Sequence, residues 1–168
     1  MFTRLPIVAF LVAVVIAPPA LAQTYPFKAY TTADGLAQSA VSCFFQDSHG
    51  YMWFGTWGGI SRYDGREFWS YRNSAFRVTS ICEDNKKTLW VGTTTGLARL
   101  AFGDSSFQWA RTLDGALPSD YVVTILKDGD GNMWVGTVKG LVVFTSSGRR
   151  VVFDRERGLQ DDYISGLK

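Results

Sequence analysis

The chain has 168 residues, of which 46% are hydrophobic and 19% are charged, and its formal net charge is +2. That length and hydrophobic content suffice for a globular domain with a core of its own. The near balance of charge, without a long run of basic residues, gives no support for nucleic acid or an anionic membrane surface as a partner.

Residues 1–22 are typical of a secretory signal peptide. Arg4 is a short basic head, residues 7–17 form an apolar run, and a small-x-small cleavage site ends at Ala22. An apolar helix of that length would span about 16 Å, roughly half of a hydrocarbon core, so an uncleaved membrane anchor is the less favoured alternative. We therefore expect cleavage after Ala22 and export of residues 23–168 to the periplasm.

One segment recurs three times after this leader, and its central feature is a tryptophan. Successive tryptophans of the repeat lie 37 and 44 residues apart. A period of this length points to a propeller, a solenoid or an array. The repeated residues are Trp53, Gly55, Thr56 and Gly59, then Trp90, Gly92, Thr93 and Gly96, and finally Trp134, Gly136, Thr137 and Gly140.

Each copy divides into four short segments that are rich in β-branched or aromatic residues and bounded by turn residues. The predicted strands are 41–46, 52–56, 60–63 and 68–71, then 78–83, 89–93, 97–100 and 107–110, and finally 122–127, 133–137, 141–144 and 151–153. Four antiparallel strands in about 40 residues match a propeller blade, whereas helical periodicity is absent. The sequence thus predicts an all-β fold, a β-propeller with blade one at 41–71, blade two at 78–110 and blade three at 122–153.

Within a blade, the repeated tryptophan is expected to bury its large apolar surface against the next blade. Gly55 and its equivalents are expected to leave room for a neighbouring backbone or ring, and Gly59 and its equivalents to adopt positive φ in a turn. The first hairpin of copy two has Lys87 where the other copies have Gly50 and Gly131. This substitution predicts a different turn type in copy two.

Single strands are expected at both ends of the repeat region. Residues 26–32 resemble the fourth strand of a closing blade, and residues 163–168 resemble the first strand of blade four. Propellers close with about four to eight blades, so an incomplete propeller is predicted, the N-terminal fragment of a longer protein whose remaining blades are its partners. Because two sheet edges would lack partners, residues 23–168 alone are expected to aggregate or to stay partly open. The alternative is that open fragments associate into a ring.

Two cysteines and one acidic loop are the candidates for a disulfide and a metal site. Cys43 and Cys82 fall at different levels of equivalent strands, which favours free, buried thiols over a disulfide. Asp128 begins a sequence that resembles a calcium loop, but Lys139 stands where an EF-hand requires a glutamate, so a hairpin turn is predicted. No metal site and no cofactor are expected.

Antiparallel strands send alternate connections to opposite ends of a blade, so the links from strand four to strand one share a rim with those from strand two to strand three. The candidate ligand-binding residues on this rim are Trp57, Arg77, Asp120, Tyr121 and Lys139. Trp57 stands where the other copies have Thr94 and Val138, so blade packing does not require an indole there. An aromatic ring beside charged side chains could stack a sugar face and bind its hydroxyls. The alternative is an aromatic loop residue that only covers its own blade.

Catalysis is not expected. The one histidine, His49, lies on the opposite rim, so no Ser-His-Asp arrangement can form around Trp57. The adjacent acids Asp161 and Asp162 should face apart, which does not suit paired-carboxylate chemistry.

The repeat of Asp, a short turn, an apolar residue, Trp, an apolar residue, Gly and Thr, completed in copy one by Arg-Tyr-Asp-Gly at residues 62–65, resembles the two-component regulator propeller repeats. The resemblance covers residues 25–168. It implies the periplasmic sensor region of a bacterial inner-membrane receptor, whose transmembrane helix and kinase or cyclase output would be downstream partners. It also implies a small-molecule or oligosaccharide ligand and pairing of receptors. The alternative is a stand-alone exported propeller that acts as a lectin-like or scaffold module.

Overall fold

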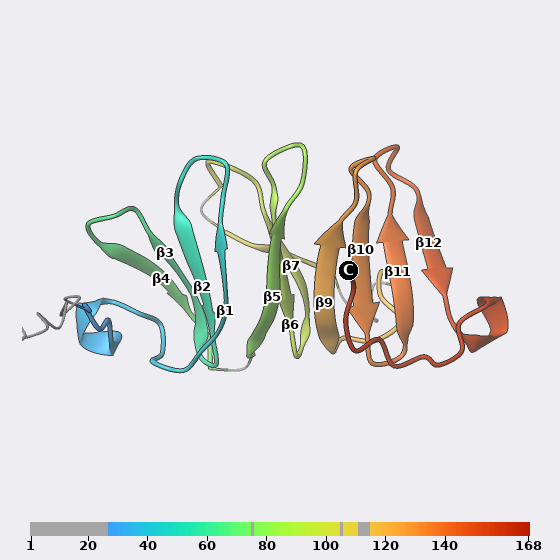
Figure 1. The fold of residues 1–168 in the computed structure, drawn as a ribbon, viewed down its shortest axis with the longest axis horizontal. Coiled ribbons are helices and arrows are strands. Elements are labelled where there is room, and N and C mark those ends of the chain that lie inside the picture. Colours follow the sequence, from blue (N-terminus) through green and yellow to red (C-terminus); the bar gives the residue numbers. More distant parts are fainter. Residues whose placement is uncertain (1–26, 75, 105, 111–114) are drawn as a thin grey trace, which may run out of the picture.

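The computed structural model describes residues 27–74, 76–104, 106–110 and 115–168, and these form three four-stranded antiparallel sheets that stand side by side (Figure 1). The expected signal peptide and its cleavage site at Ala22 lie outside the described residues. None of the helices in those four ranges is long and apolar enough to cross a membrane.

Each sheet has the strand order of the chain. Sheet one holds β1 (Val41–Gln46), β2 (Met52–Thr56), β3 (Gly59–Tyr63) and β4 (Phe68–Arg72). Sheet two holds β5 (Val78–Glu83), β6 (Leu89–Thr93), β7 (Gly96–Leu100) and β8 (Gln108–Ala110). Sheet three holds β9 (Val122–Lys127), β10 (Met133–Thr137), β11 (Gly140–Phe144) and β12 (Arg150–Phe153). All the strands predicted inside the blades are therefore present, with ends that differ by one residue at most.

The sheets are arranged as blades around an axis. The first strands contact one another, β1 with β5 and β5 with β9, while β2 contacts β5 and β6 contacts β9. Contact between neighbouring sheets is thus concentrated on the inner strands, as in the wedge-shaped blades of a propeller. The fold is an all-β propeller arc, as predicted.

Two hydrophobic cores lie between neighbouring blades. Trp53 and Ile60 of blade one pack with Val78 and Ile81 of blade two, and the second core joins blades two and three in the same way. Trp53 is 4% exposed and Trp90 is 5% exposed, so their predicted role in the interface is confirmed. Trp134, on the last blade described, is half-buried.

The repeat aspartate at the end of each first strand organises the blade. One carboxylate oxygen of Asp47 accepts the backbone N–H groups of His49 and Tyr51, and the other accepts the indole N–H of Trp53 at 2.8 Å. The same bonds recur at Asp84 and in blade three. The aspartate therefore closes the hairpin and fixes the tryptophan that fills the interface, and the hairpin turn predicted at Asp128 is confirmed.

The glycine after each tryptophan makes room for the next blade. A Cβ on Gly55 would lie 2.5 Å from Val78, one on Gly92 would lie 2.7 Å from Val122, and one on Gly136 would lie 2.5 Å from Ile164. The occupant is an aliphatic side chain, so the expectation of a backbone or an aromatic ring is wrong. The second repeat glycine has a positive φ of 124° to 140° in all three blades, as predicted.

Lys87 corrects the prediction of a different hairpin in blade two. Its φ is 64°, in the left-handed region that Gly50 and Gly131 occupy at φ 88° and 81°. Its N–H donates to the carbonyl of Asp84, as that of Gly50 does to Asp47. The turn is the same because the aspartate bonds impose it, and a residue with a Cβ takes up the strained conformation.

The strands expected at 26–32 and 163–168 are absent from the described chain. Thr32–Asp34 is a 3-10 helix (η1), and no strand is assigned after the 3-10 helix Arg155–Arg157 (η2). A strand needs the ladder of a neighbouring strand to satisfy its backbone, and among the described residues neither segment pairs with one. Ile164 nevertheless packs against Gly136 of blade three as Val78 packs against Gly55 of blade one. Its N–H donates to the carbonyl of Thr137.

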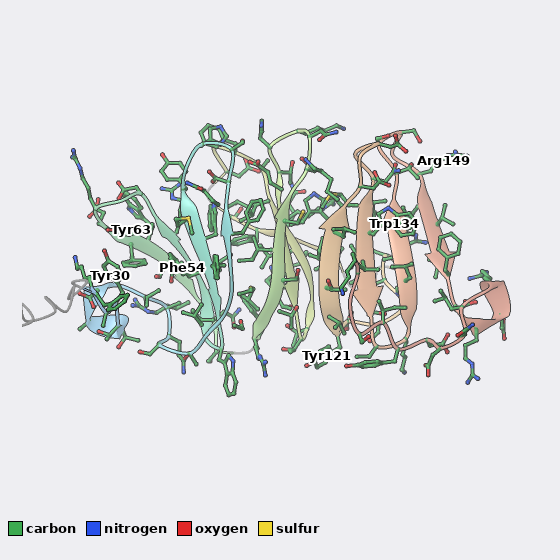
Figure 2. The ribbon with its side chains drawn as sticks, in the orientation of Figure 1. Tyr30, Phe54, Tyr63, Tyr121, Trp134 and Arg149 are labelled. Atoms are coloured by element: carbon green, nitrogen blue, oxygen red, sulfur yellow. The ribbon has the colours of Figure 1, made fainter. Side chains whose placement is uncertain are left out.

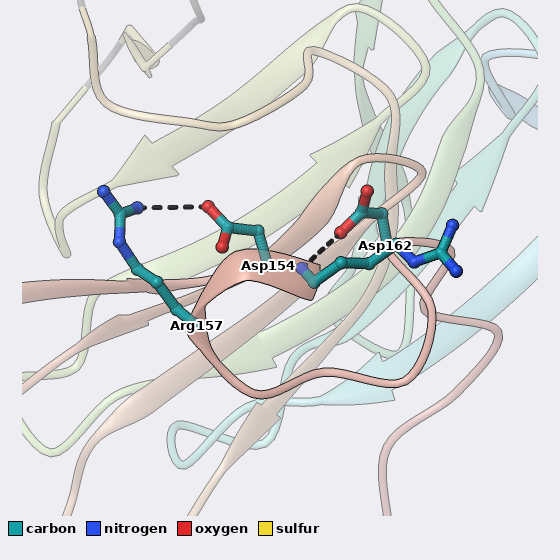
Figure 3. A network of polar contacts seen from close by, with 4 residues as sticks. Asp154, Arg157 and Asp162 are labelled. Atoms are coloured by element: carbon teal, nitrogen blue, oxygen red, sulfur yellow. Dashed lines mark hydrogen bonds and ion pairs between the residues drawn. The ribbon is translucent and has the colours of Figure 1, made fainter.

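The polar contacts after blade three brace this C-terminal segment (Figure 3). Asp162 accepts the backbone N–H of Arg155 at 2.8 Å, and Arg157 pairs with Asp154 at 3.1 Å. They hold the segment as it returns along the lower edge of the sheets towards blade three (Figure 1).

Cys43 and Cys82 are free, as predicted, but they are half-buried rather than buried. Burial raises the pKa of both thiols, which keeps them protonated and poorly nucleophilic.

Candidate ligand-binding rim

The connections of the blades form two rims. We call the lower edge in Figure 1 the Trp57 rim, because it carries the β2–β3, β6–β7 and β10–β11 turns and the links between blades. We call the opposite edge the Asp47 rim, because it carries the β1–β2, β5–β6 and β9–β10 hairpins and the links from third to fourth strands. Tyr121 lies on the Trp57 rim, as Figure 2 shows.

Trp57 and Arg77 form a stacked pair on the Trp57 rim. The guanidinium carbon of Arg77 lies 4.5 Å from the centre of the Trp57 ring system. The Trp57 side chain remains 54% exposed, so much of the indole is open to solvent beside a positive charge. A cation on one part of an exposed indole leaves an apolar surface on which a ligand ring can stack.

The backbone fixes both members of this pair. The N–H of Trp57 donates to the carbonyl of Ala40 at 3.3 Å. Arg77 is held to Thr94 twice, through its N–H to the threonine hydroxyl at 3.2 Å and through its carbonyl to the threonine N–H at 3.0 Å. Each residue therefore sits at a defined point where a link between blades meets a turn.

Asp120, Tyr121 and Lys139 lie on the same rim, one blade further along the arc. Tyr121 is 41% exposed, and its carbonyl accepts the N–H of Val138 in the β10–β11 turn at 3.2 Å. Lys139 is exposed and lies in the same turn, while Asp120 is half-buried. The structure thus brings Trp57 and Arg77 into contact and places the other three candidates around blade three.

Tyr163 is a rim residue that the candidate set omitted. It belongs to a set of three residues that each precede a residue packed against the glycine of the preceding blade. These pairs are Arg77 before Val78, Tyr121 before Val122 and Tyr163 before Ile164. Tyr163 is 56% exposed. The common offset from the repeat would have identified it, because the residue before that core position faces the rim each time.

The acids near Tyr163 are used for local structure. Asp161 accepts the N–H of Tyr163 at 3.0 Å, and Asp162 accepts the N–H of Arg155 at 2.8 Å.

His49 lies on the Asp47 rim, across the blade from Trp57, and stacks on Phe102 with ring centres 3.9 Å apart. Within the described ranges, no group of three or more His, Cys, Asp or Glu side chains could hold a metal ion.

Comparison with known proteins agrees with this architecture. The two component regulator propeller family matches residues 35–58, 73–95 and 116–139, one segment for each of the three blades. The chain contains three two-component regulator propeller repeats. Each matched segment of this family runs from the link before a blade into its β2–β3-type turn, so it contains the repeat aspartate, tryptophan and glycine together with the rim positions before each blade.

The proteins to which the chain is similar include a histidine kinase and the extracellular domains of two B. thetaiotaomicron proteins. The chain is 44% identical over 57 residues to histidine kinase P4 of Formosa agariphila, a match that covers 34% of this chain and 4% of the kinase. The extracellular domain assigned to the hybrid two component system BT3049 of B. thetaiotaomicron superposes with a TM-score of 0.66 at 27% identity, over 75% of this chain and 18% of that one. The extracellular domain assigned to the one component system BT4673 gives 0.60 at 29% identity, over 74% and 17%. The chain therefore spans less than a fifth of each of these relatives.

Proposed function

We propose that this chain is the ligand-sensing propeller of an exported, membrane-anchored signalling receptor, and that it acts in the periplasm. The support is the repeat family, the sensor-type extracellular domains with the same fold, and the histidine kinase relative. The chemistry of signalling would then belong to a kinase or cyclase output domain, and the propeller itself would bind without catalysing.

The proposed ligand is an oligosaccharide bound at the Trp57 rim. The observation that carries this proposal is the exposed indole of Trp57 with Arg77 stacked 4.5 Å from it, at a turn position where the other blades have Thr94 and Val138. Since those blades pack without an aromatic residue there, the fold does not require the indole. Sugars present an apolar face and a ring of hydroxyls, which suit an indole beside a cation and the nearby polar side chains.

Signalling would follow from the position of this site. The Trp57 rim carries the links between blades, and Arg77 belongs to the link from blade one to blade two. A ligand that binds Trp57 and Arg77 together would favour one relative pose of these blades, or of two paired receptors, over another. Such a difference in affinity between poses is what a binding event can transmit to an output domain.

The test is titration of the purified protein with neutral oligosaccharides by calorimetry. We expect Trp57→Ala to weaken binding several-fold, up to about ten-fold, because an aromatic stacking contact contributes roughly 0.5–1.5 kcal/mol. Trp69→Ala is the matched control, since Trp69 is 39% exposed and stacks on Arg62 at 4.8 Å, but it lies on the outer strand β4. Equal oligosaccharide affinity in wild type and Trp57→Ala would remove the indole from the site.

A further inference from the structure

The Asp47 rim contains two equivalent gaps between neighbouring blades. The gap between blades one and two is lined by Asp47, Trp53 and Arg62. The gap between blades two and three is lined by the residues at the same repeat positions, Asp84, Trp90 and Arg99. The two gaps can therefore be compared position by position, because equivalent residues of the repeat line both.

Residues of the β7–β8 connection fill most of the first gap. The β7–β8 connection lies over it, and Phe102 from that connection stacks flat on His49, with ring centres 3.9 Å apart and planes 7° apart. The cavity that remains is about 40 Å³. This is little more than the space of one water molecule.

The second gap is open. The β11–β12 connection, which would correspond to the lid over the first gap, is a tight turn from Thr145 to Arg149, closed by a bond of 2.8 Å between the Thr145 N–H and the Arg149 carbonyl. It carries no aromatic side chain. The cavity measures about 440 Å³, in the range of small-molecule sites.

The arginines of the two gaps have different surroundings. Arg62 has aromatic rings around its guanidinium, Tyr51 at 4.5 Å and Trp69 at 4.8 Å. At the corresponding positions beside Arg99 the chain has Thr88, four residues after the repeat aspartate, and Gln108, the cross-strand partner of Arg99. Both polar residues line the second cavity. The second gap thus lacks an aromatic lid residue like Phe102 and both of the rings that surround Arg62. The guanidinium of Arg99 therefore borders an open pocket.

Arg99 has unused hydrogen-bonding capacity. Its Nε is buried and has no hydrogen-bond partner among the described residues, while its guanidinium carbon lies 5.3 Å from the Trp90 ring. A buried donor without a partner is costly, so the guanidinium of Arg99 carries an N–H group that the described residues leave unsatisfied. The Nε of Arg62 is also unpaired, but rings rather than a cavity surround it.

The charge of the pocket favours an anion. The charged lining residues are Asp84, Lys86 and Arg99. The Asp84 carboxylate is engaged, since it accepts the N–H groups of Lys86 and Thr88 and the indole N–H of Trp90 at 2.8–2.9 Å. The two cations therefore dominate what a ligand meets, and a guanidinium binds carboxylates through paired hydrogen bonds.

From this arrangement we infer that the pocket between blades two and three binds a small organic carboxylate with hydroxyl groups, of the size and polarity of a sugar acid. The carboxylate pairs with Arg99, the hydroxyls bond to Thr88 and Gln108, and the apolar part of the ligand lies against Phe144. This site lies on the rim opposite Trp57 and does not depend on the proposed function of that residue.

The test is calorimetric titration of the purified protein with sodium glucuronate, glucose and sodium sulfate. We expect glucuronate to bind about ten-fold or more tightly than glucose, and Arg99→Gln to remove that difference. Arg62→Gln is the matched control and should leave glucuronate affinity unchanged. Sulfate binding as tight as glucuronate would overturn the assignment to a sugar acid, because the pocket would then hold any oxyanion.

A second variant keeps the test decisive if Arg99→Gln fails to fold. Gln108→Trp copies the ring that Trp69 places over Arg62 and fills the cavity without removing a charge. We expect it to fold, as judged by an unchanged melting temperature, and to lose glucuronate binding. Unaltered glucuronate affinity in Gln108→Trp, or binding by glucose equal to that of glucuronate, would overturn the inference.

Discussion

The carboxylate of Asp128 accepts the indole N–H of Trp134 at 2.8 Å, and one such bond joins aspartate to tryptophan in every blade. The bond from Trp134, followed by that from the side chain of Asn132, lowers the pKa of Asp128 to about 2 from its ordinary value of 3.8. Because the charged carboxylate is the better acceptor, ionisation of Asp128 is coupled to the position of the tryptophan that forms the blade interface.

The first prediction concerns pH. Since the pKa of Asp128 is lower in the folded protein than in the unfolded chain, its contribution to stability is complete above about pH 4 and is lost as the pH falls towards 2. Trp134→Phe removes the indole donor, so we expect the pKa of Asp128 to rise towards 3.8 and the acid-induced fall in melting temperature to shrink. Carboxyl-carbon NMR titration measures this pKa. Trp69→Phe serves as the control, and an Asp128 pKa unaltered by Trp134→Phe would refute the coupling.

The second prediction concerns Lys87, whose φ of 64° is left-handed. Lys87→Gly relieves a conformation that costs a residue with a Cβ roughly 1–2 kcal/mol, so the free energy of unfolding should rise by about 1 kcal/mol. Chemical denaturation provides the measurement. The reciprocal change Gly50→Lys should lower stability by a similar amount, because a Cβ on Gly50 meets nothing within 4 Å and only the backbone is strained.

A neighbouring position separates backbone strain from the loss of a lysine. Lys86 does not share the positive φ of Lys87, so Lys86→Gly should destabilise by about 0.5–1 kcal/mol through added freedom of the unfolded chain. If Lys86→Gly and Lys87→Gly change stability in the same direction, the strain at Lys87 is not the cause.

The third prediction tests the contact across blades at Gly92. A Cβ at this position would lie 2.7 Å from Val122 Cγ1 and 3.1 Å from Thr79 Oγ1, so Gly92→Ala should overpack the interface and cost about 1–3 kcal/mol. Gly129→Ala, where a Cβ meets nothing within 4 Å, should have little effect on the free energy of unfolding. The double variant Gly92→Ala, Val122→Ala should lose less stability than the sum of its parts, and strict additivity would argue against direct contact.

The fourth prediction concerns the face of β1 that carries Phe44. Phe44 is 72% exposed, whereas Ile81 and Ile125 at the same repeat position are 8% and 7% exposed against the preceding blade. For this chain on its own we expect Phe44→Ser to reduce self-association, because it removes a large apolar side chain from an uncovered blade face. Light scattering over a concentration series measures the effect. Phe102→Ser, which removes a 62% exposed ring from a loop, should change self-association less.

Much of the fold was predictable because it is specified locally. The strands of the three blades and the positive φ of Gly59 follow from alternating apolar residues and turn residues that act within a few positions of one another. The place of Trp57 on a rim followed from the same alternation. The repeat amplified this information, since each short pattern occurs three times in register.

The tertiary structure decided whatever depends on residues far apart in the sequence. Val78, rather than a ring or backbone, fills the space at Gly55, and the expected strand at 163–168 does not form without a partner strand. The stacking of Arg77 on Trp57 and the open pocket at Arg99 likewise arise where loops of different strands meet. Hydrogen-bond ladders and side-chain packing join neighbours in space, so a sequence pattern specifies the surface that each blade offers, and only the assembled blades determine what that surface meets.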